Sequence, residues 1–393
     1  MEFKLDWPSR GHDYNDSEVQ AVVELLRDNN STLSQSVHVQ SFEQEFASYI
    51  KTPYAYALMS CAHALDIAAL LLNIKHGDEV IIPSHTYCAT ALAFARRGAK
   101  IVWCDIDPDS LTMSPEHLIN LISSHTKAIV IVHLYGLLSP HIEQISKIAT
   151  SNNIPLIEDC AQSLGSKLDS SHSGTFGDIG CFSFHSQKNM TTLGEGGMIV
   201  TNNSDFASRI PGLRLNGHSA YSKKSKYWLP SMVNVDRDID GAWPTKSTMS
   251  EAQALIGRRV LRRLDEMISK RRARACYIRK EMEQFKEVRF QSIYAKEGHS
   301  HHLLPFYYSN YKVSRDQLIE VLSSRYGIKA IIQYHPLHRY DLFVKTGHGV
   351  ADVPVTDEFF SKMVSLPFSL TQSDNDFEYL VESLRNALLY LRE

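Results

Sequence analysis

The sequence has little of what would set a chain apart from ordinary globular proteins. No apolar run approaches the roughly 18 residues that a membrane span needs, and the opening residues MEFKLDWPSRGHD include no apolar segment like that of a secretory signal. The formal net charge is −3 over 393 residues, so no excess of one sign points to nucleic acid or an anionic membrane as a partner. We therefore expect a protein that acts without a membrane and without nucleic acid.

Close cysteine spacings are also missing. None of the six cysteines forms a CxxC pair, and most lie in apolar segments; they are Cys61, Cys88, Cys104, Cys160, Cys181 and Cys276. Buried, reduced thiols and a cytoplasmic location are therefore expected. His299, His301 and His302 lie close together, but no carboxylate or cysteine completes a metal site, so strand packing is favoured and no metal is expected.

What the chain does have is enough apolar sequence for a large core. Its 393 residues are 43% apolar, which suits two or three domains. In the first half, segments of helical periodicity alternate with expected strands at 54–59, 79–83, 100–105, 128–132 and 156–158. This alternation is typical of a mostly parallel sheet with helices on both faces. Farther along, we predict a helical tract at 250–285 and strands of a second α/β unit at 302–308 and 329–333.

Polar side chains follow several of these strands. Ser60, Tyr87, Tyr135, Asp159 and Gln162 each come after an expected strand end. Ligands of parallel α/β sheets lie beyond the carboxyl ends of the strands. We therefore expect one crevice to gather these five residues.

The stretch Asp178–Asn202 carries the most specific pattern. It begins and ends with apolar, strand-like residues, and between them lies a polar turn that contains Lys188 and the run GEGG at 194–197. Two such strands joined by Gly and Asn predict a hairpin or a strand–loop–strand unit. A turn of this kind can hold the Lys188 side chain toward a cleft.

A lysine combined with a strand-end aspartate suits pyridoxal 5'-phosphate (PLP). This cofactor needs a lysine amine for a Schiff base and an acid beside its pyridinium nitrogen. Lys188 and Asp159 suit these roles, and Ser183 supplies a hydroxyl for the phosphate. Taken alone, a lysine in a Gly-rich loop is usually solvated, and a strand-end aspartate is often a helix N-cap. The pair gains weight because both residues belong to a longer pattern.

A possible phosphate site lies upstream. An expected strand runs through the small residues Ser60-Cys61-Ala62 into a helix, and the free N–H groups at a helix N-terminus favour an anion. Tyr87, after the next strand, is suited to stack on a pyridine ring and exclude water. An ordinary helix start and a plain core tyrosine are the alternative interpretations.

Together these segments resemble the DegT/StrS family of PLP-dependent aminotransferases, which aminate keto-sugars. The match runs from Ser183-Phe184 through Lys188 to the Glu-Gly-Gly at 195–197, with Glu-Asp-x-Ala-Gln upstream at 158–162 and a similar helix at 42–49. It covers about residues 10–392. It implies a fold-type I PLP transferase, with a large PLP-binding domain at 1–250 built on a mostly parallel seven-stranded sheet covered by helices. A linking helix and a smaller C-terminal α/β domain would occupy 251–393.

The resemblance also implies roles for individual residues. Gln162 would hydrogen-bond the ring hydroxyl. Lys246 stands where the family has a phosphate-binding Asn, and would reach the cofactor of the partner subunit across a homodimer interface. Candidate substrate contacts are His185, His335 and His338, the last two in a segment similar to the family's H-Y-P-x-P-L-H.

The implied reaction is the transfer of an amino group from an amino acid to a keto-sugar in amino-sugar biosynthesis. The family generally uses glutamate as donor and nucleotide-linked keto-sugars as acceptors. Lys188 would move the proton from the donor's Cα as general base and acid. Asp159 would keep the ring nitrogen protonated, which stabilises the developing carbanion.

Three other functions stay open. A PLP-dependent keto-sugar dehydratase would have histidine in place of Lys188, and a cyclitol aminotransferase would differ only in its substrate loops. A non-catalytic PLP-binding regulator is the third, because Cys61 and Ala62 depart from the Gly-Thr of the family's phosphate turn. Lys223 and Lys224 are further candidates for contact with the diphosphate of an acceptor.

Overall fold

The computed structural model describes residues 3–217, 239 and 241–392, and its main element is a seven-stranded sheet. The strand order is β1-β9-β8-β5-β4-β2-β3. The strands are β1 Tyr54–Leu58, β2 Glu79–Pro83, β3 Lys100–Cys104, β4 Thr126–Val132, β5 Leu156–Asp159, β8 Ile179–Ser183 and β9 Gly197–Thr201. Only β9 runs antiparallel to its neighbours, β1 and β8, so the predicted mostly parallel sheet is confirmed.

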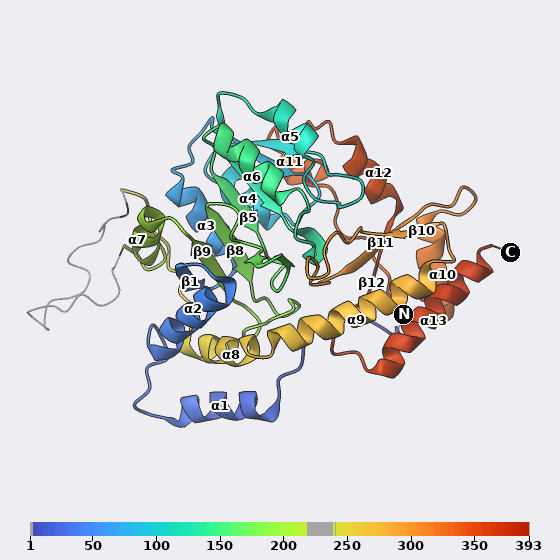
Figure 1. Cartoon of the computed structure of the whole chain (residues 1–393), viewed down its shortest axis with the longest axis horizontal. Helices are drawn as coiled ribbons and strands as arrows, with labels where there is room; N and C mark the ends of the chain where they lie inside the picture. The colour runs from blue at the N-terminus through green and yellow to red at the C-terminus, as the bar shows by residue number, and fades with distance from the viewer. Residues whose placement is uncertain (1–2, 218–238, 240, 393) are drawn as a thin grey trace, which may run out of the picture.

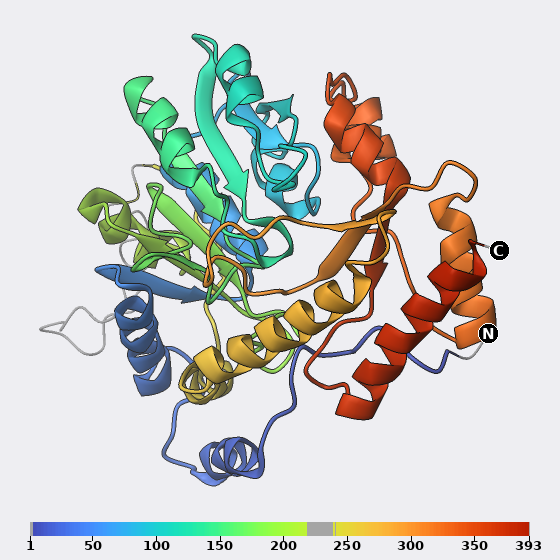
Figure 2. The same cartoon turned by 45° about the vertical axis from the view of Figure 1, so that its right-hand side comes forward.

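Helices cover both faces of this sheet (Figures 1 and 2). One layer contains α3 Cys61–Leu71, α4 Ala89–Ala95 and α7 Ser204–Leu213, and the other contains α2 Val37–Ile50, α5 Pro115–Leu121, α6 Ile142–Ser151 and α8 Glu251–Leu261. Successive strand residues point to opposite faces. Val80 and Ile82 therefore pack in the α3 layer, while Ile81 packs with α5 and α6. Because both faces are covered, most strand residues are apolar, and Glu158 and Asp159 at the end of β5 are among the polar exceptions.

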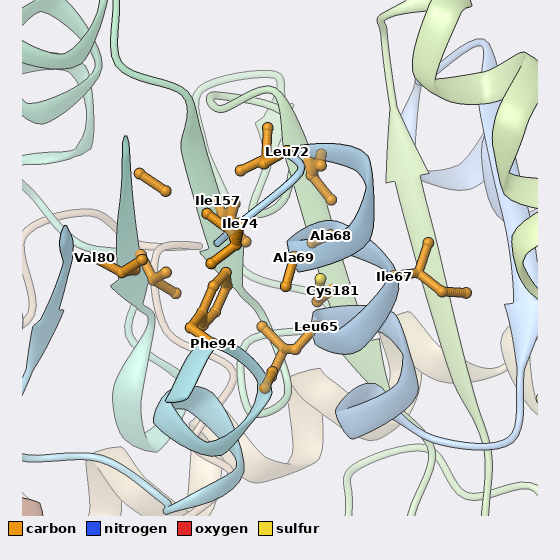
Figure 3. Close-up of a cluster of buried hydrophobic side chains, with 14 of the residues drawn as sticks. Leu65, Ile67, Ala68, Ala69, Leu72, Ile74, Val80, Phe94, Ile157 and Cys181 are labelled. Carbon is orange, nitrogen blue, oxygen red and sulfur yellow. The ribbon is translucent and has the colours of Figure 1, made fainter. Parts of the chain in front are cut away.

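Helix α3 is almost wholly buried, which fixes the position of its N-terminus. Leu65, Ala68 and Ala69 lie beside Phe94 of α4 and Ile157 of β5 (Figure 3). The small alanine side chains let the helix approach the sheet closely, and an apolar surface on all sides is typical of a core helix. The first residues of α3 therefore lie at a fixed place above the sheet.

The predicted helical tract at 250–285 consists of two helices, α8 and α9 Leu264–Met282. Between them, the guanidinium of Arg263 binds the carboxylate of Glu18, with 2.7 Å between Nε and Oε1. Glu18 belongs to α1 Asp16–Arg27, which begins with a capping box formed by Asn15 and Glu18. Helix α9 then runs to the second sheet (Figure 1).

The second sheet has three antiparallel strands, β10 Val288–Phe290, β11 Leu304–Tyr308 and β12 Met363–Leu366. Its core also takes side chains from α10 Arg315–Tyr326 and α13 Asp374–Tyr390. The remaining elements are β6 Lys167–Leu168, β7 Ser171–His172, η1 Leu134–Gly136, η3 Leu337–Arg339, α11 Asp341–Lys345 and α12 Pro354–Lys362.

The prediction of a strand at 329–333 is wrong. This segment makes only an isolated bridge between Ile331 and Ser365, and Ile328 just before it bridges to Leu5. The apolar pattern arises because the segment lies between β12 and the N-terminal residues, not because it pairs along its length.

Residues 5–12, which we call the N-terminal strap, connect the second sheet to the Lys188 loop. Leu5 bridges to Ile328, and the indole N–H of Trp7 donates to the carbonyl oxygen of Lys329 at 2.8 Å. At the other end, the N–H of Gly11 donates to the carbonyl oxygen of Ser186 at 2.8 Å. The strap therefore holds together segments more than 100 residues apart in sequence.

None of the described helices is long and apolar enough to cross a bilayer. The six cysteines have free thiols, and Cys276 is the exposed one. Lys223 and Lys224, named above as candidate diphosphate contacts, lie outside the described residues.

Candidate active site

A cavity of about 720 Å³ opens at the carboxyl ends of β4, β5 and β8. This volume lies within the range of ordinary ligand sites. The structure brings nine of the predicted site residues to its wall: Ser60, Cys61, Ala62, Tyr87, Asp159, Gln162, Ser183, His185 and Lys188. Tyr135 lies behind the wall and donates its backbone N–H to Oε1 of Gln162 at 2.6 Å. Four of the five residues expected to share one crevice, Ser60, Tyr87, Asp159 and Gln162, therefore line this cavity, and Tyr135 does not.

The Lys188 side chain reaches this cavity from a tight turn after β8. The N–H of Lys188 donates to the carbonyl oxygen of His185 at 2.9 Å, and Gly11 of the strap packs directly against the turn. Burial lowers the pKa of the Lys188 ammonium, while the nearby Asp159 carboxylate and Cys61 thiol act in the opposite direction. A lysine amine with a lowered pKa is suited to nucleophilic attack and proton transfer.

Asp159 lies at the end of β5 with its carboxylate in the wall of the cavity. One oxygen accepts the hydroxyl of Thr90 at 2.8 Å, and the other accepts the N–H of Ala161 at 3.0 Å. Burial raises the pKa of Asp159, and these two hydrogen bonds and the charge of Lys188 oppose that rise. A cationic ring nitrogen beside Asp159 would supply the counter-charge that favours the carboxylate.

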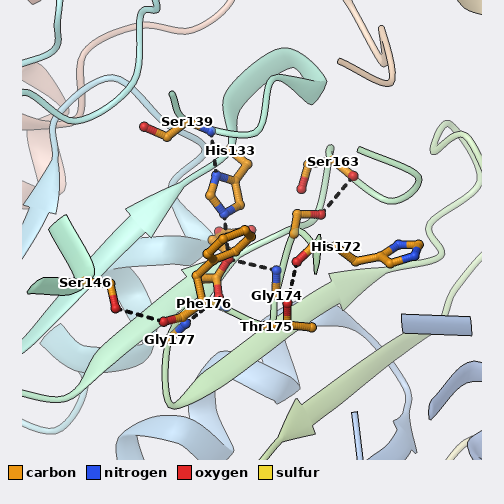
Figure 4. Close-up of polar contacts among 12 residues, drawn as sticks. His133, Ser139, Ser146, Ser163, His172, Gly174, Thr175, Phe176 and Gly177 are labelled. Carbon is orange, nitrogen blue, oxygen red and sulfur yellow. Dashed lines mark hydrogen bonds and ion pairs between the residues drawn. The ribbon is translucent and has the colours of Figure 1, made fainter. Parts of the chain in front are cut away.

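The adjacent Glu158 points to the opposite face of the strand and anchors it. Its carboxylate accepts Nε2–H of His133 at 2.8 Å and backbone N–H groups from the 174–177 turn, a network shown in Figure 4. Nδ1 of His133 accepts the N–H of Ser139 at 3.1 Å. His133, Glu158 and Cys160 are close enough to hold a metal ion. The hydrogen bonds already use both nitrogens of His133, so the arrangement supports β5 rather than a metal.

The N-terminus of α3 lies at one end of the cavity. Ser60 is its N-cap and accepts the N–H of His63 at 3.3 Å. First-turn N–H groups of a helix have no intrahelical partner and attract a phosphate. Gly197 packs so closely that a Cβ there would lie 2.3 Å from the carbonyl carbon of Ser60. The Ser183 hydroxyl, on the adjoining strand, accepts the N–H of His185 at 3.3 Å and faces the same cavity.

Two aromatic residues line the space between these ends. Tyr87 is 56% exposed, and its ring centroid lies 6.1 Å from that of Tyr334. The phenol of Tyr334 accepts a hydrogen bond at 2.9 Å from Nε2 of Gln162. The amide of Gln162 is therefore held by Tyr334 and Tyr135, which fixes its orientation beside the cavity.

The candidate substrate residues divide into two groups. His185 lines the cavity, and its Nε2 lies 4.0 Å from the Glu195 carboxylate. His335 packs against aromatic rings instead, and His338 is held at 2.7 Å by the Ser84 hydroxyl. Neither belongs to the wall of this cavity, and neither does Lys246.

Several wall or support residues were not assigned a role from the sequence. They are Thr90, Arg271, His302 and Tyr334. His302 stood in a histidine-rich run that suggested strand packing, and Arg271 stood in the predicted helical tract at 250–285 without a role of its own. Only the folded chain shows that both are buried in the wall of this cavity and that His302 approaches Lys188. For Thr90 the sequence offered a weak signal, its position one helical turn after Tyr87.

The wall of this cavity fits PLP. A lysine amine of lowered pKa, a buried carboxylate and a capped helix N-terminus face one space of suitable size. These are the groups that a PLP enzyme needs for covalent attachment, ring protonation and phosphate binding. Fold and cavity therefore define a PLP-dependent transferase.

Comparison with known proteins gives the family. The model of the DegT/DnrJ/EryC1/StrS aminotransferase family matches residues 12–385, and the chain belongs to this family. The protein is thus a PLP-dependent aminotransferase of the DegT/StrS sugar-aminotransferase type.

Relatives extend over nearly the whole chain. GDP-perosamine synthase of Escherichia coli O157:H7 is 31% identical over 352 residues, which cover 89% of this chain and 90% of that protein. The dTDP-3-amino-3,6-dideoxy-alpha-D-galactopyranose transaminase of Aneurinibacillus thermoaerophilus is 31% identical, covering 88% and 89%. Among solved structures, an aminotransferase from Psychrobacter cryohalolentis is 25% identical and has a TM-score of 0.89, with 100% of both chains covered.

Proposed function

We propose that the chain transfers the amino group of glutamate to a nucleotide-linked keto-sugar, with Lys188 as the residue that holds PLP and carries the proton. The observation that carries this proposal is the position of Lys188 in one cavity with Asp159 and the N-terminus of α3. When bound, PLP supplies an electron sink for the carbanion formed at the amino acid's Cα. The side chains of the cavity wall bind the cofactor and substrates, transfer the proton and exclude water.

Each wall residue has a distinct task in this proposal. Lys188 takes the proton from the donor's Cα and returns it at the carbon next to the ring, as general base and then general acid. Asp159 holds the ring nitrogen in its protonated form. The N–H groups of Cys61 and Ala62, with the Ser183 hydroxyl, bind the phosphate, and Tyr87 covers the ring and excludes water.

Gln162 and His185 are the proposed contacts nearest to the reacting groups. The amide of Gln162, fixed by Tyr135 and Tyr334, is offered to the ring hydroxyl. His185 is half-exposed at the rim, where an acceptor would enter. His335 and His338 act at most indirectly, since they lie outside the wall.

The choice of acceptor is supported by the relatives. Two of them are named for products of amino transfer to nucleotide-linked sugars, one GDP-linked and one dTDP-linked. A keto-sugar attached to a nucleoside diphosphate is therefore the acceptor class we propose.

We further propose that the protein works as a homodimer in the cytoplasm. Lys246 lies outside the wall of its own chain's cavity, so in this proposal it serves the phosphate of the other subunit. The free thiols of all six cysteines suit a reducing compartment.

The test is an amino-transfer assay with glutamate and a panel of GDP- and dTDP-linked keto-sugars. Formation of 2-oxoglutarate and of an amino-sugar in equal amounts, abolished by Lys188→Ala, supports the proposal. Loss of a hydroxyl from the sugar without amine transfer would instead indicate a dehydratase. Activity with a cyclitol ketone alone, or cofactor binding without turnover, would point to the other two alternatives.

A further inference from the structure

His302 is a buried histidine whose ring contacts Lys188. Its side chain lines the cavity, and Nε2 lies 3.5 Å from Nζ of Lys188. The other ring nitrogen, Nδ1, is buried and has no hydrogen-bond partner among the described residues. Buried polar atoms in native proteins are nearly always hydrogen-bonded, and leaving one unpaired costs free energy. Packing alone therefore does not explain why a histidine occupies this position.

The backbone around His302 is firmly held. Nη1 of the buried Arg271 lies 3.0 Å from the carbonyl oxygen of His301 and 3.4 Å from that of His302. The next N–H, that of Leu303, donates to the carbonyl oxygen of Tyr135 at 3.2 Å. Arg271 thus fixes the point from which the imidazole projects toward Lys188.

The surroundings keep this imidazole neutral. Burial lowers the pKa of His302 well below its usual range, and the positive charges of Lys188, Arg271 and His185 lower it further. Lys188 itself also faces Asp159 on β5 and Cys61 on α3. A neutral imidazole has one nitrogen lone pair, so Nε2 can accept a hydrogen bond from the lysine amine.

We propose that His302 is a positioning residue for the Lys188 amine. Its Nε2 accepts an N–H of Lys188 and so directs the amine lone pair into the cavity. When Lys188 takes the Cα proton, the C–H electron pair stays on the substrate side and Nζ becomes an ammonium. The same hydrogen bond then stabilises that ammonium. This role rests on the proposed function of Lys188 as proton carrier.

The chain offers a matched control in His301. Its ring is also buried and also has an unpaired Nδ1, but it stacks on His299 with centroids 3.8 Å apart and lies outside the wall of the cavity. A change at His301 perturbs the same buried cluster without touching Lys188.

The experiment compares His302→Phe and His302→Leu, whose side chains have no hydrogen-bond acceptor, with His302→Gln, which retains one, and with His301→Phe. The full-length, cofactor-free proteins are labelled with an amine-reactive reagent over a pH range, and the midpoint for Lys188 is read by mass spectrometry. The PLP-loaded proteins are assayed for kcat and for the KM of glutamate. Thermal unfolding checks that each variant is folded.

Removing the acceptor should lower the labelling midpoint by about one pH unit, a tenfold weaker hold on the proton. It should also reduce kcat about tenfold or more, with little change in KM, because the lost contact acts on the proton transfer. His302→Gln should keep the midpoint and kcat near the wild-type values, and His301→Phe should leave the midpoint unmoved.

Two results would overturn the proposal: wild-type midpoints in both acceptor-free variants, or an equal shift in His301→Phe. Two acceptor-free variants of different shape are included so that one folding failure does not remove the test. The labelling midpoint is independent of turnover. If Lys188→Ala retained full activity, the proposed function would fail, while the midpoint would still report on the contact between His302 and Lys188.

Discussion

At the scale of single residues, the chemistry of the site depends on how burial and a few hydrogen bonds set the charge of Lys188 and Asp159. Both side chains were singled out from the sequence, because the residues around them form a long and specific pattern. Thr90 and His302 were not given these roles, since they approach Asp159 and Lys188 only when distant segments fold together. The local sequence pattern thus indicates the reacting groups but not the side chains that hydrogen-bond to them and influence their charge.

Replacing Asp159 with asparagine tests its part in this arrangement. An amide has no negative charge to keep the ring nitrogen protonated, so the rate of amino transfer from glutamate should fall about 10²- to 10³-fold. Stopped-flow absorbance of the cofactor measures this rate. Asp178→Asn is the control, because among the described residues its carboxylate accepts only the N–H of Leu156, at the end of β5 opposite to Asp159. A rate in Asp159→Asn within a few-fold of the wild type would contradict the assignment.

At the scale of elements, regular segments were predictable and their irregular neighbours were not. Apolar alternation placed the strands that flank the Lys188 loop, and the structure shows them as the antiparallel pair β8 and β9. The same pattern failed at 329–333, where an extended segment touches the strap instead of pairing. The strap itself has no periodic signal, because its fixed position comes from backbone hydrogen bonds to Lys329 and Ser186.

Gly11→Ala tests whether the strap sets the position of the Lys188 loop. A Cβ at Gly11 would lie 1.9 Å from the carbonyl oxygen of Lys188, so the loop or the strap must move. We expect a loss of stability of about 1–3 kcal/mol, and weaker PLP binding, measured by urea unfolding and by cofactor titration. Ser9→Ala, in the same strap, should change neither, because the Ser186 hydroxyl donates to the backbone carbonyl of Ser9, which this substitution keeps. Unaltered PLP affinity in Gly11→Ala would show that the strap does not set the position of the Lys188 loop.

At the scale of the whole molecule, the parallel sheet followed from strands that alternate with helices, and the family resemblance added the number of strands. The sequence could not show that His335 and His338 pack away from the cavity, since their motif says nothing of how the second sheet faces the first. It also could not show how many buried histidines the fold contains.

These histidines predict a loss of stability in acid. Burial lowers the pKa of His85 and His301 to about 3 and that of His172 to about 4, against 6.5 for a free side chain. The unfolded chain therefore takes up protons below about pH 6.5 while the folded chain does not, so stability is full above that pH and falls down to about pH 3–4. Each such residue contributes about 1.4 kcal/mol per pH unit in this window.

Urea unfolding between about pH 7 and pH 5 measures this slope. His172→Gln removes one group that takes up a proton on unfolding. The slope of the unfolding free energy against pH should therefore fall by up to about 1.4 kcal/mol per pH unit. An unfolding free energy that is the same at both ends of the range would show that the histidines are not held neutral.

Mixing subunits tests the proposed dimer. If Lys246 serves the cofactor of the other subunit, Lys188→Ala and Lys246→Ala chains are both impaired alone. A mixed dimer then has one site with both changes and one site with neither. When equal amounts of the two chains pair at random, half of the dimers contain one chain of each kind. Each of these has one intact site of two, so about a quarter of wild-type activity should return. No recovery after verified subunit exchange would contradict a shared site.

The most direct test of the central claim is the visible absorption spectrum of the purified protein before and after glutamate is added, beside that of Lys188→Ala. The account predicts a band of lysine-bound PLP in the wild type that glutamate converts to the spectrum of pyridoxamine phosphate. It predicts no lysine-bound band in Lys188→Ala. A wild-type band that glutamate leaves unchanged would contradict glutamate as donor, and the same lysine-bound band in Lys188→Ala would contradict Lys188 as the residue that holds the cofactor.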